Sequence, residues 1–306
     1  MNRRAFLHSA AALAALAPMS GGLRGAPAAV PRTRELKKGF MFSTLRVDPD
    51  RPLSVLERFK MLRDAGFDGV EVMSPLDQAE VLAARDATGL EIPSVVIATH
   101  WSHPLSHPNP VTRQVTVEAL QQGLRDARAY RARSVLLVPA VVNAEIAYDE
   151  AYRRSVEEIS KVVPLAEELG VAIAIENVWN NFLLSPLEAL QYVDAFGSPM
   201  VRWHFDVGNV LNTGWPEQWI RLLGPRIVHV HAKAYSRKLR DERGPRAGFG
   251  VDLLEGDGDW PAVMAALDEI GYTGWLTVEQ THRRPNQSNA DWLAQLVRDL
   301  ATITTL

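Results

Sequence analysis

The sequence predicts a single (β/α)8 TIM barrel, and three observations lead to this fold class. The chain has 306 residues, which suits one barrel of about 250 residues with a leader segment before it. From about residue 38, short apolar runs alternate eight times with amphipathic segments. The later apolar runs end in polar residues, as strands do at the face of a barrel that carries a site. The eightfold count favours a closed barrel over a doubly wound open sheet.

The predicted elements follow this alternation along the chain. The strands are expected at 39–45, 68–73, 92–98, 133–139, 171–176, 200–206, 226–233 and 273–280. The helices are expected at 52–65, 76–88, 111–130, 149–169, 186–196, 215–223, 260–270 and 288–303.

The N-terminal segment is typical of a cleavable export signal of the twin-arginine type. Arg3 and Arg4 precede a short alanine-rich apolar run, and GAPAAV supplies small residues around a cleavage position at Ala28. The alternative is a frayed N-terminal helix. We therefore predict a signal peptide at 1–28, a linker at 29–37 and a catalytic barrel domain at 38–306, in a protein that is periplasmic or exported.

Composition excludes several classes of protein. No run of about 20 apolar residues is present, so no membrane span is predicted. Residues outside the predicted signal include 30 basic and 36 acidic side chains, which argues against nucleic acid as a partner. The chain has no cysteine, so disulfides and thiolate chemistry are excluded.

Local signals mark the ends of individual helices. The segments SPLD at 74–77 and SPLE at 185–188 each predict a Ser N-cap, a Pro in the first turn and an acid at the third position. Gly66 and Gly271 are each expected to end a helix shortly before a strand begins. The connection at 234–258 is longer than the others and carries SRKLRDERGPR. It is expected to be either a solvated charged loop or a lid over a site.

Alternation within four late strands places polar side chains inside the barrel. In a barrel strand every second residue faces the interior. In 171–176 the residues Val171, Ile173 and Ile175 face the helices, and Glu176 faces inward. The strands around 201–206, 228–233 and 276–279 alternate in the same way. The inward polar residues at the ends of the four strands are Glu176, Asp206, His231 and Glu279.

These four residues predict a metal site. Three carboxylates that meet in a partly dry cleft repel one another and are expected to become neutral. A divalent cation removes this conflict. One imidazole and three carboxylates suit one Mn²⁺, Mg²⁺, Co²⁺ or Zn²⁺ ion. Any one of the four taken alone is more simply a helix cap or a hydrogen-bonded core residue.

Other polar residues near the strand ends are weaker candidates for contact with a ligand. His100 and Trp101, in THWSHPLSHP at 99–108, suit a sugar site, although packing of the loop explains them equally well. Glu71 is expected at the rim, in contact with substrate or in a structural salt bridge. His204 and His229 are expected one layer below the site, as hydrogen-bonding support for the ligands.

Four segments resemble the xylose-isomerase-like TIM barrels, a superfamily that includes ketose 3-epimerases, sugar isomerases and type IV apurinic endonucleases. They are AIENVWNNFLLSPLEAL, WHFDVGN, VHVHAKAY and EGDGDWPAVMAALDEIGYTGWLTVEQ. The resemblance covers roughly residues 38–303. It implies that Glu176, Asp206, His231 and Glu279 bind the metal, and that Glu176 and Glu279 also act as catalytic acid and base.

The resemblance also implies contacts with substrate. Lys233 matches the Lys of a common His-x-Lys-Asp motif, although Ala234 replaces the Asp. Arg237 stands where ketose epimerases tend to carry a substrate-binding Arg. Asn209 stands where many relatives carry a His, and it is a further candidate contact. The endonucleases need additional His and Asp ligands, which VEVMS and the residues after His231 do not supply.

The implied function is a metal-dependent sugar isomerase or epimerase. It would remove a proton next to the carbonyl of a keto sugar and form a metal-stabilised enediolate. Two alternatives remain open: a metal-dependent lyase or hydratase on 3-keto-glycosides, and an exported non-catalytic sugar-binding protein. In each case the expected partner is a small carbohydrate, and the predicted export of the protein favours one without phosphate. Whether the chain forms a homo-oligomer is left open.

Overall fold

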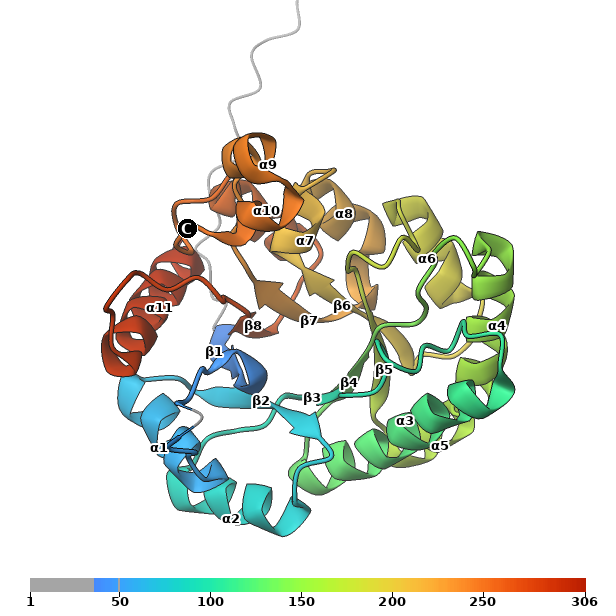
Figure 1. Cartoon of the computed structure of the whole chain (residues 1–306), viewed down its shortest axis with the longest axis horizontal. Coiled ribbons are helices and arrows are strands. Elements are labelled where there is room, and N and C mark those ends of the chain that lie inside the picture. The colour runs from blue at the N-terminus through green and yellow to red at the C-terminus, as the bar shows by residue number, and fades with distance from the viewer. Residues whose placement is uncertain (1–35, 49) are drawn as a thin grey trace, which may run out of the picture. The chain divides into compact units, whose positions relative to one another are not determined.

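Eight parallel strands close into a barrel, and the helices form an outer ring around it (Figure 1). The computed structural model describes residues 36–48 and 50–306. Neighbouring strands follow chain order from β1 to β8, and β8 pairs with β1 to close the barrel. The predicted fold class is confirmed. The predicted signal peptide lies outside the described residues, and β1 begins inside the segment predicted as a linker.

Most of the observed elements overlap the predicted ranges, but the first strand lies at 36–41 and not at 39–45, and the helices at 207–211 and 237–243 were not predicted. The strands are β1 (Leu36–Met41), β2 (Gly69–Ser74), β3 (Ser94–Ile97), β4 (Ser134–Leu137), β5 (Ala172–Glu176), β6 (Val201–Asp206), β7 (Ile227–Ala232) and β8 (Gly274–Val278). The α-helices are α1 (Val55–Ala65), α2 (Gln78–Thr88), α3 (Pro110–Tyr130), α4 (Tyr148–Ser160), α5 (Val163–Leu169), α6 (Pro186–Asp194), α7 (Val207–Leu211), α8 (Pro216–Leu223), α9 (Arg237–Arg243), α10 (Trp260–Glu269) and α11 (Asn289–Thr304).

Strand register aligns the late strands of the barrel with one another. Glu176 in β5 pairs with His204 in β6, and Asp206 in β6 pairs with His231 in β7. The outward residues of the same strands are apolar and fully buried, among them Trp203 and Phe205. Burial of each such side chain stabilises the fold by about 1.5–3 kcal/mol. The outward apolar residues thus pack the strands against the helices. The inward residues are not needed for this packing, and they can therefore be polar.

Helix boundaries confirm one predicted N-cap and correct the other. Ser185 begins α6 and its side chain accepts a hydrogen bond from the Glu188 amide at 3.2 Å. The expected Ser74 cap is wrong, because Ser74 still belongs to β2 and its hydroxyl donates to Asp126 at 2.8 Å. Asp77 caps α2 instead. Since α2 begins only at Gln78, Ser74 lies too far before the helix to cap it.

Two further boundaries differ from a simple strand–helix alternation. The segment predicted as one helix at 149–169 is two, α4 and α5, and α5 carries Pro164 in its first turn. Proline has no amide hydrogen to continue the preceding helix, so the chain begins a new one there. Gly66 ends α1 with φ of 101°, and Gly271 follows α10 with φ of 67°. This is the left-handed backbone that favours glycine.

The long segment 234–258 is not the loop that the sequence predicts. It contains α9 and the 3₁₀-helix η3 (Pro245–Phe249). Ser236 caps α9 by accepting a hydrogen bond from the Leu239 amide at 3.3 Å. Whether segment 234–258 moves as a lid over the site stays a prediction.

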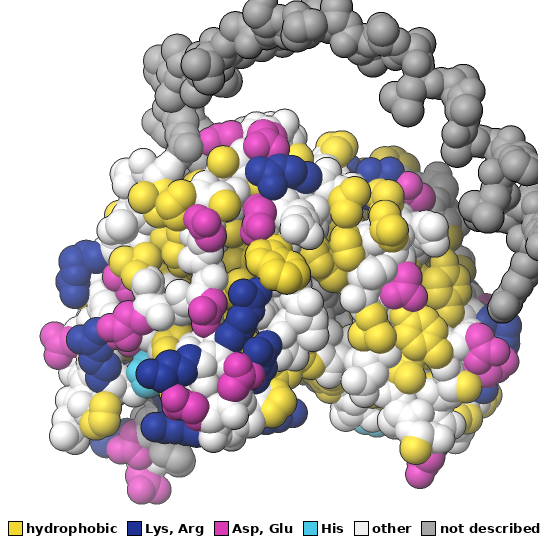
Figure 2. Space-filling view, turned by 90° about the horizontal axis from the view of Figure 1, so that it is seen from above, with side chains coloured by type: hydrophobic (Ala, Val, Ile, Leu, Met, Phe, Trp, Pro, Cys, Tyr) yellow, Lys and Arg dark blue, Asp and Glu magenta, His cyan; other side chains and the backbone are white. Residues whose placement is uncertain are grey.

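The surface mixes charges of both signs. Figure 2 shows acidic side chains beside basic ones, with hydrophobic patches between them, on the face it presents. Among residues 36–48 and 50–306, no helix combines the length and apolar character needed to cross a bilayer.

Candidate metal centre

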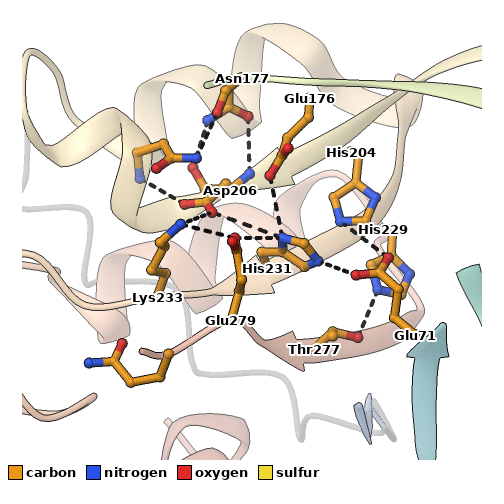
Figure 3. A network of polar contacts seen from close by, with 12 residues as sticks. Glu71, Glu176, Asn177, His204, Asp206, His229, His231, Lys233, Thr277 and Glu279 are labelled. Carbon is orange, nitrogen blue, oxygen red and sulfur yellow. Dashed lines mark hydrogen bonds and ion pairs between the residues drawn. The ribbon is translucent and has the colours of Figure 1, made fainter. Parts of the chain in front are cut away.

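The four predicted ligands meet at the carboxyl end of the barrel (Figure 3). Glu176 ends β5, Asp206 ends β6, His231 lies in β7 and Glu279 follows β8. Each offers one ligand atom, and these atoms all lie within 4.8 Å of one another. The four residues are buried or nearly so. Parallel strands present their carboxyl ends at the same rim, which is why residues more than 100 positions apart converge.

A single ring nitrogen of His231 faces all three carboxylates. His231 Nδ1 lies 3.1 Å from Glu279 Oε2, 3.4 Å from Glu176 Oε1 and 3.9 Å from Asp206 Oδ2. Lys233 Nζ lies 3.0 Å from Glu279 Oε2 and 3.4 Å from Asp206 Oδ2. Oxygen and nitrogen donors therefore surround a small space, and a lysine at its edge contributes a positive charge.

The directions in which the pKa values of these groups are shifted indicate that the cluster favours added positive charge. Burial raises the pKa of Glu176, and the charge of Glu279 adds to this rise. Burial likewise raises the pKa of Asp206 well above its ordinary range, against the opposing effect of Lys233. Burial alone would also raise the pKa of Glu279, but Lys233 and His231 outweigh it and the pKa is lowered.

The imidazole has the opposite balance. Burial by itself would lower the pKa of His231, but the carboxylates of Glu71, Glu176 and Glu279 raise it well above its ordinary value. A divalent cation would replace these protons and stabilise all three carboxylates. Three carboxylates and one imidazole are a donor set that fits a hard or borderline divalent ion.

Asn177 joins the ends of β5 and β6 behind the carboxylates. Its Nδ2 donates to the Asp206 carbonyl at 2.7 Å. Its Oδ1 accepts from Trp203 Nε1 at 3.1 Å and from the Asp206 amide at 3.0 Å. All three contacts are buried, so they fix the backbone that carries Asp206.

Asn209 is used by the scaffold. Its amide donates to Asp206 Oδ1 at 2.7 Å, and its Nδ2 donates to the Asn177 carbonyl at 3.0 Å. Gly208 allows α7 to approach β7, because a Cβ there would lie 2.7 Å from the Lys233 carbonyl oxygen. The structure thus gives Asn209 a positioning role where the sequence predicts contact with substrate.

Glu71 differs from the prediction that it points to the open rim. It is fully buried, and its Oε2 lies 2.7 Å from His231 Nε2. Of the two expected roles, substrate contact and salt bridge, the geometry supports the second. His204 and His229 lie beside it as expected, with ring centroids 4.1 Å and 6.0 Å from that of His231.

His100 and Trp101 lie in the loop after β3. His100 is buried, and its Nδ1 accepts a hydrogen bond from the Val138 amide at 3.3 Å. Burial lowers the pKa of His100 to about 4, so the ring is neutral at physiological pH. The structure gives His100 a loop-packing role, whereas Trp101 is 49% exposed and remains accessible.

The contacts of Arg237 are with residues outside the metal centre. Its guanidinium donates to the carbonyls of Leu211 at 3.0 Å and Gly214 at 2.7 Å, and it lies over the ring of Trp215 at 5.3 Å. These contacts attach α9 to the connection between α7 and α8. The predicted substrate contact by Arg237 therefore has no support in its observed partners.

Two aromatic residues beside Lys233 were missed by the sequence reasoning. The rings of Trp179 and Phe249 pack with centroids 4.8 Å apart, and Lys233 Nζ lies 4.9 Å from the Phe249 ring. Trp179 also lines a cavity of about 280 Å³ together with Asn177 and Asn209. Trp179 lies three residues after Glu176, and this position in the sequence could have indicated that it lies near the site. Phe249 lies in η3, and nothing in its local sequence indicates that it reaches the site.

Comparisons with known proteins agree with this architecture. L-ribulose-5-phosphate 3-epimerase UlaE from Escherichia coli O1:K1 is 26% identical over 237 residues, which cover 73% of this chain and 81% of that protein. The solved structure of 3-keto-D-glucoside 4-epimerase YcjR from E. coli has 16% identity and a TM-score of 0.70, with 89% of this chain and 100% of that chain covered. The solved structure of IolI protein with a zinc atom has 15% identity and a TM-score of 0.70, with 88% and 98% covered.

The family itself is shown by a match to a family model. The model described as "Xylose isomerase-like TIM barrel" matches residues 59–300, which is most of the barrel. The resemblance predicted from four sequence segments is thereby confirmed, and the chain belongs to the xylose isomerase-like TIM barrel family.

Proposed function

We propose that this protein is a divalent-metal-dependent sugar isomerase or epimerase. The observation that carries the proposal is the convergence of Glu176, Asp206, His231 and Glu279 at the end of the barrel where enzymes of this fold carry their sites. The names of two similar proteins, a ribulose-phosphate 3-epimerase and a 3-keto-glucoside 4-epimerase, describe epimerisation of sugars and support this reaction class.

The four residues of the centre would hold the ion. When bound, a divalent ion supplies positive charge that stabilises negative charge developing on neighbouring substrate oxygens. Glu176 and Glu279 approach this space from different strands and have pKa values shifted in opposite directions. Such a pair can divide the tasks of taking a proton from carbon and returning one. Lys233 keeps Glu279 ionised and ready to accept the proton.

The substrate class we propose is a keto sugar or keto-glycoside without phosphate. Removal of the proton next to the carbonyl gives an enediolate of the substrate. Return of a proton to the opposite face is epimerisation, and return to the neighbouring carbon is aldose–ketose isomerisation. The predicted export of the protein favours an unphosphorylated substrate.

The reaction is tested by proton exchange. Metal-loaded protein is incubated in D₂O with ketoses and, separately, with 3-keto-glucosides, and the products are followed by NMR. Deuterium incorporation with the carbon skeleton and glycosidic bond intact is the expected result. Release of the aglycone would assign the protein as a lyase. Tight sugar binding without exchange would identify a binding protein and contradict the proposal.

Metal binding is expected to strengthen as pH rises. The raised pKa values of Glu176, Asp206 and His231 mean that protons occupy these ligands at higher pH than usual. Each proton displaced by the ion makes the apparent affinity about tenfold stronger per pH unit below the pKa of that ligand. Calorimetric titration with Mn²⁺ at pH 6 and pH 8, in buffers of different ionisation enthalpy, measures both affinity and proton release. Equal affinity at the two pH values would contradict this expectation.

A further inference from the structure

A second cluster of possible ligands lies beneath the metal centre, inside the barrel. We call Glu71, His204, His229 and His231 the inner cluster. Each offers one ligand atom, and these atoms lie within 4.8 Å of one another. All four side chains are at most 1% exposed. Figure 3 shows Glu71, His204 and His229 close together on one side of His231.

Several polar atoms of the inner cluster lack hydrogen-bond partners among the described residues. Both ring nitrogens of His204 are unpartnered, and so is Glu71 Oε1. His204 Nε2 and Glu71 Oε1 face each other at 3.8 Å, which is beyond hydrogen-bonding distance. A buried polar group without a partner costs about 1–3 kcal/mol. A role in supporting His231 does not explain why these atoms are unpartnered, because Glu71 contacts His231 through Oε2 and not through Oε1.

His231 lies between the two clusters and presents a different nitrogen to each. Its Nδ1 faces Glu176 and Glu279, and its Nε2 lies 2.7 Å from Glu71 Oε2. His229 stands beside His204 with ring centroids 4.6 Å apart, and its Nε2 is 2.7 Å from Thr277 Oγ1. Three imidazoles and one carboxylate therefore surround the space below His231.

We propose that the inner cluster is a second divalent-metal site, selective for Zn²⁺ or Co²⁺. Three imidazole nitrogens and one carboxylate suit borderline ions in four-coordinate geometry. The metal centre above, which has three carboxylates and one imidazole, suits harder ions. The inner ion replaces the proton that His231 Nε2 shares with Glu71, and this proton is released to solvent. His231 then serves both ions, one through each ring nitrogen. The proposal rests on the inner cluster and not on the sugar chemistry.

Metal counting with Co²⁺ tests the second site. Apo-protein is titrated with Co²⁺, bound metal is measured by mass spectrometry after gel filtration, and visible absorption reports coordination. We expect two Co²⁺ per wild-type chain, one of them with the intense bands of tetrahedral cobalt. His204→Leu should bind one Co²⁺ and lose these bands. Asp206→Asn should lose the outer ion and keep the bands, and His103→Leu, outside both clusters, should bind two.

Two outcomes would overturn the proposal. One Co²⁺ per wild-type chain would leave Glu71 as a hydrogen-bond partner of His231 only. Two Co²⁺ in His204→Leu would place the second ion elsewhere. If circular dichroism shows that His204→Leu does not fold, His229→Gln replaces it in the same assay with the same expected loss. If the protein binds two ions but catalyses no proton exchange on sugars, the proposed function is contradicted and the inner metal site is not. The two proposals can therefore fail separately.

Discussion

Replacement of Glu279 with glutamine is expected to lower the rate of proton exchange on the substrate by about 10³-fold. The amide has nearly the shape of the carboxylate but cannot accept a proton. Glu279 also has a lowered pKa because Lys233 and His231 lie next to it, although burial opposes the shift. The variant removes the group that is best placed to act as an ionised base at neutral pH.

The measurement is the rate of deuterium incorporation from D₂O, with metal content and circular dichroism recorded on the same sample. Metal content separates loss of the base from loss of the ion, because Glu279 is also a proposed ligand. Glu255→Gln is the matched control, since the Glu255 side chain is 62% exposed and forms an ion pair with Arg284 at 3.7 Å, away from the candidate ligands. Undiminished exchange in Glu279→Gln would remove this residue from the mechanism.

The largest effect on stability is expected for Asn177→Leu. The side chain of Asn177 satisfies three buried groups: the Asp206 carbonyl, the Asp206 amide and Trp203 Nε1. Leucine has similar size but leaves all three without a partner, at about 1–3 kcal/mol each. We expect a loss of at least about 3 kcal/mol in the free energy of unfolding. For a domain of this size that lowers Tm by roughly 5 °C.

Thermal and urea unfolding of metal-free protein measure this loss without a contribution from ion binding. Trp203→Phe provides a graded comparison, because it removes one of the three hydrogen bonds and keeps an aromatic ring in the core. It should cost about 1–2 kcal/mol, clearly less than Asn177→Leu. A Tm of Asn177→Leu within 2 °C of wild type would show that the Asn177 contacts do not hold β5 and β6 together.

The convergence of Glu176, Asp206, His231 and Glu279 could be predicted because it depends on features that are local to each strand. Side chains alternate with a period of two, so the apolar Ile173 and Ile175 determine that Glu176 faces inward. Strand order then places Asp206 and His231 at the same rim, since the carboxyl ends of parallel strands coincide. No knowledge of side-chain packing was needed for either step.

The weaker predictions required information that a local pattern does not contain. Glu71 was expected at the rim, yet it binds His231, which is 160 positions away and reaches it only across the closed barrel. Arg237 was expected at the substrate, yet its guanidinium donates to the carbonyls of Leu211, at the end of α7, and of Gly214. A long polar side chain can pair with several groups. The group that it pairs with in the folded chain lies on another element, so the local sequence does not identify it.

Periodicity and strand order are present in the sequence, and they are sufficient to predict a closed barrel with three carboxylates and an imidazole at one end. Which polar residues support that centre from below depends on packing between strands, and the unpartnered His204 of the inner cluster is seen only in the folded chain. Closing the barrel excludes water from its interior. Each polar group there must then pair with residues from other strands, or with an ion.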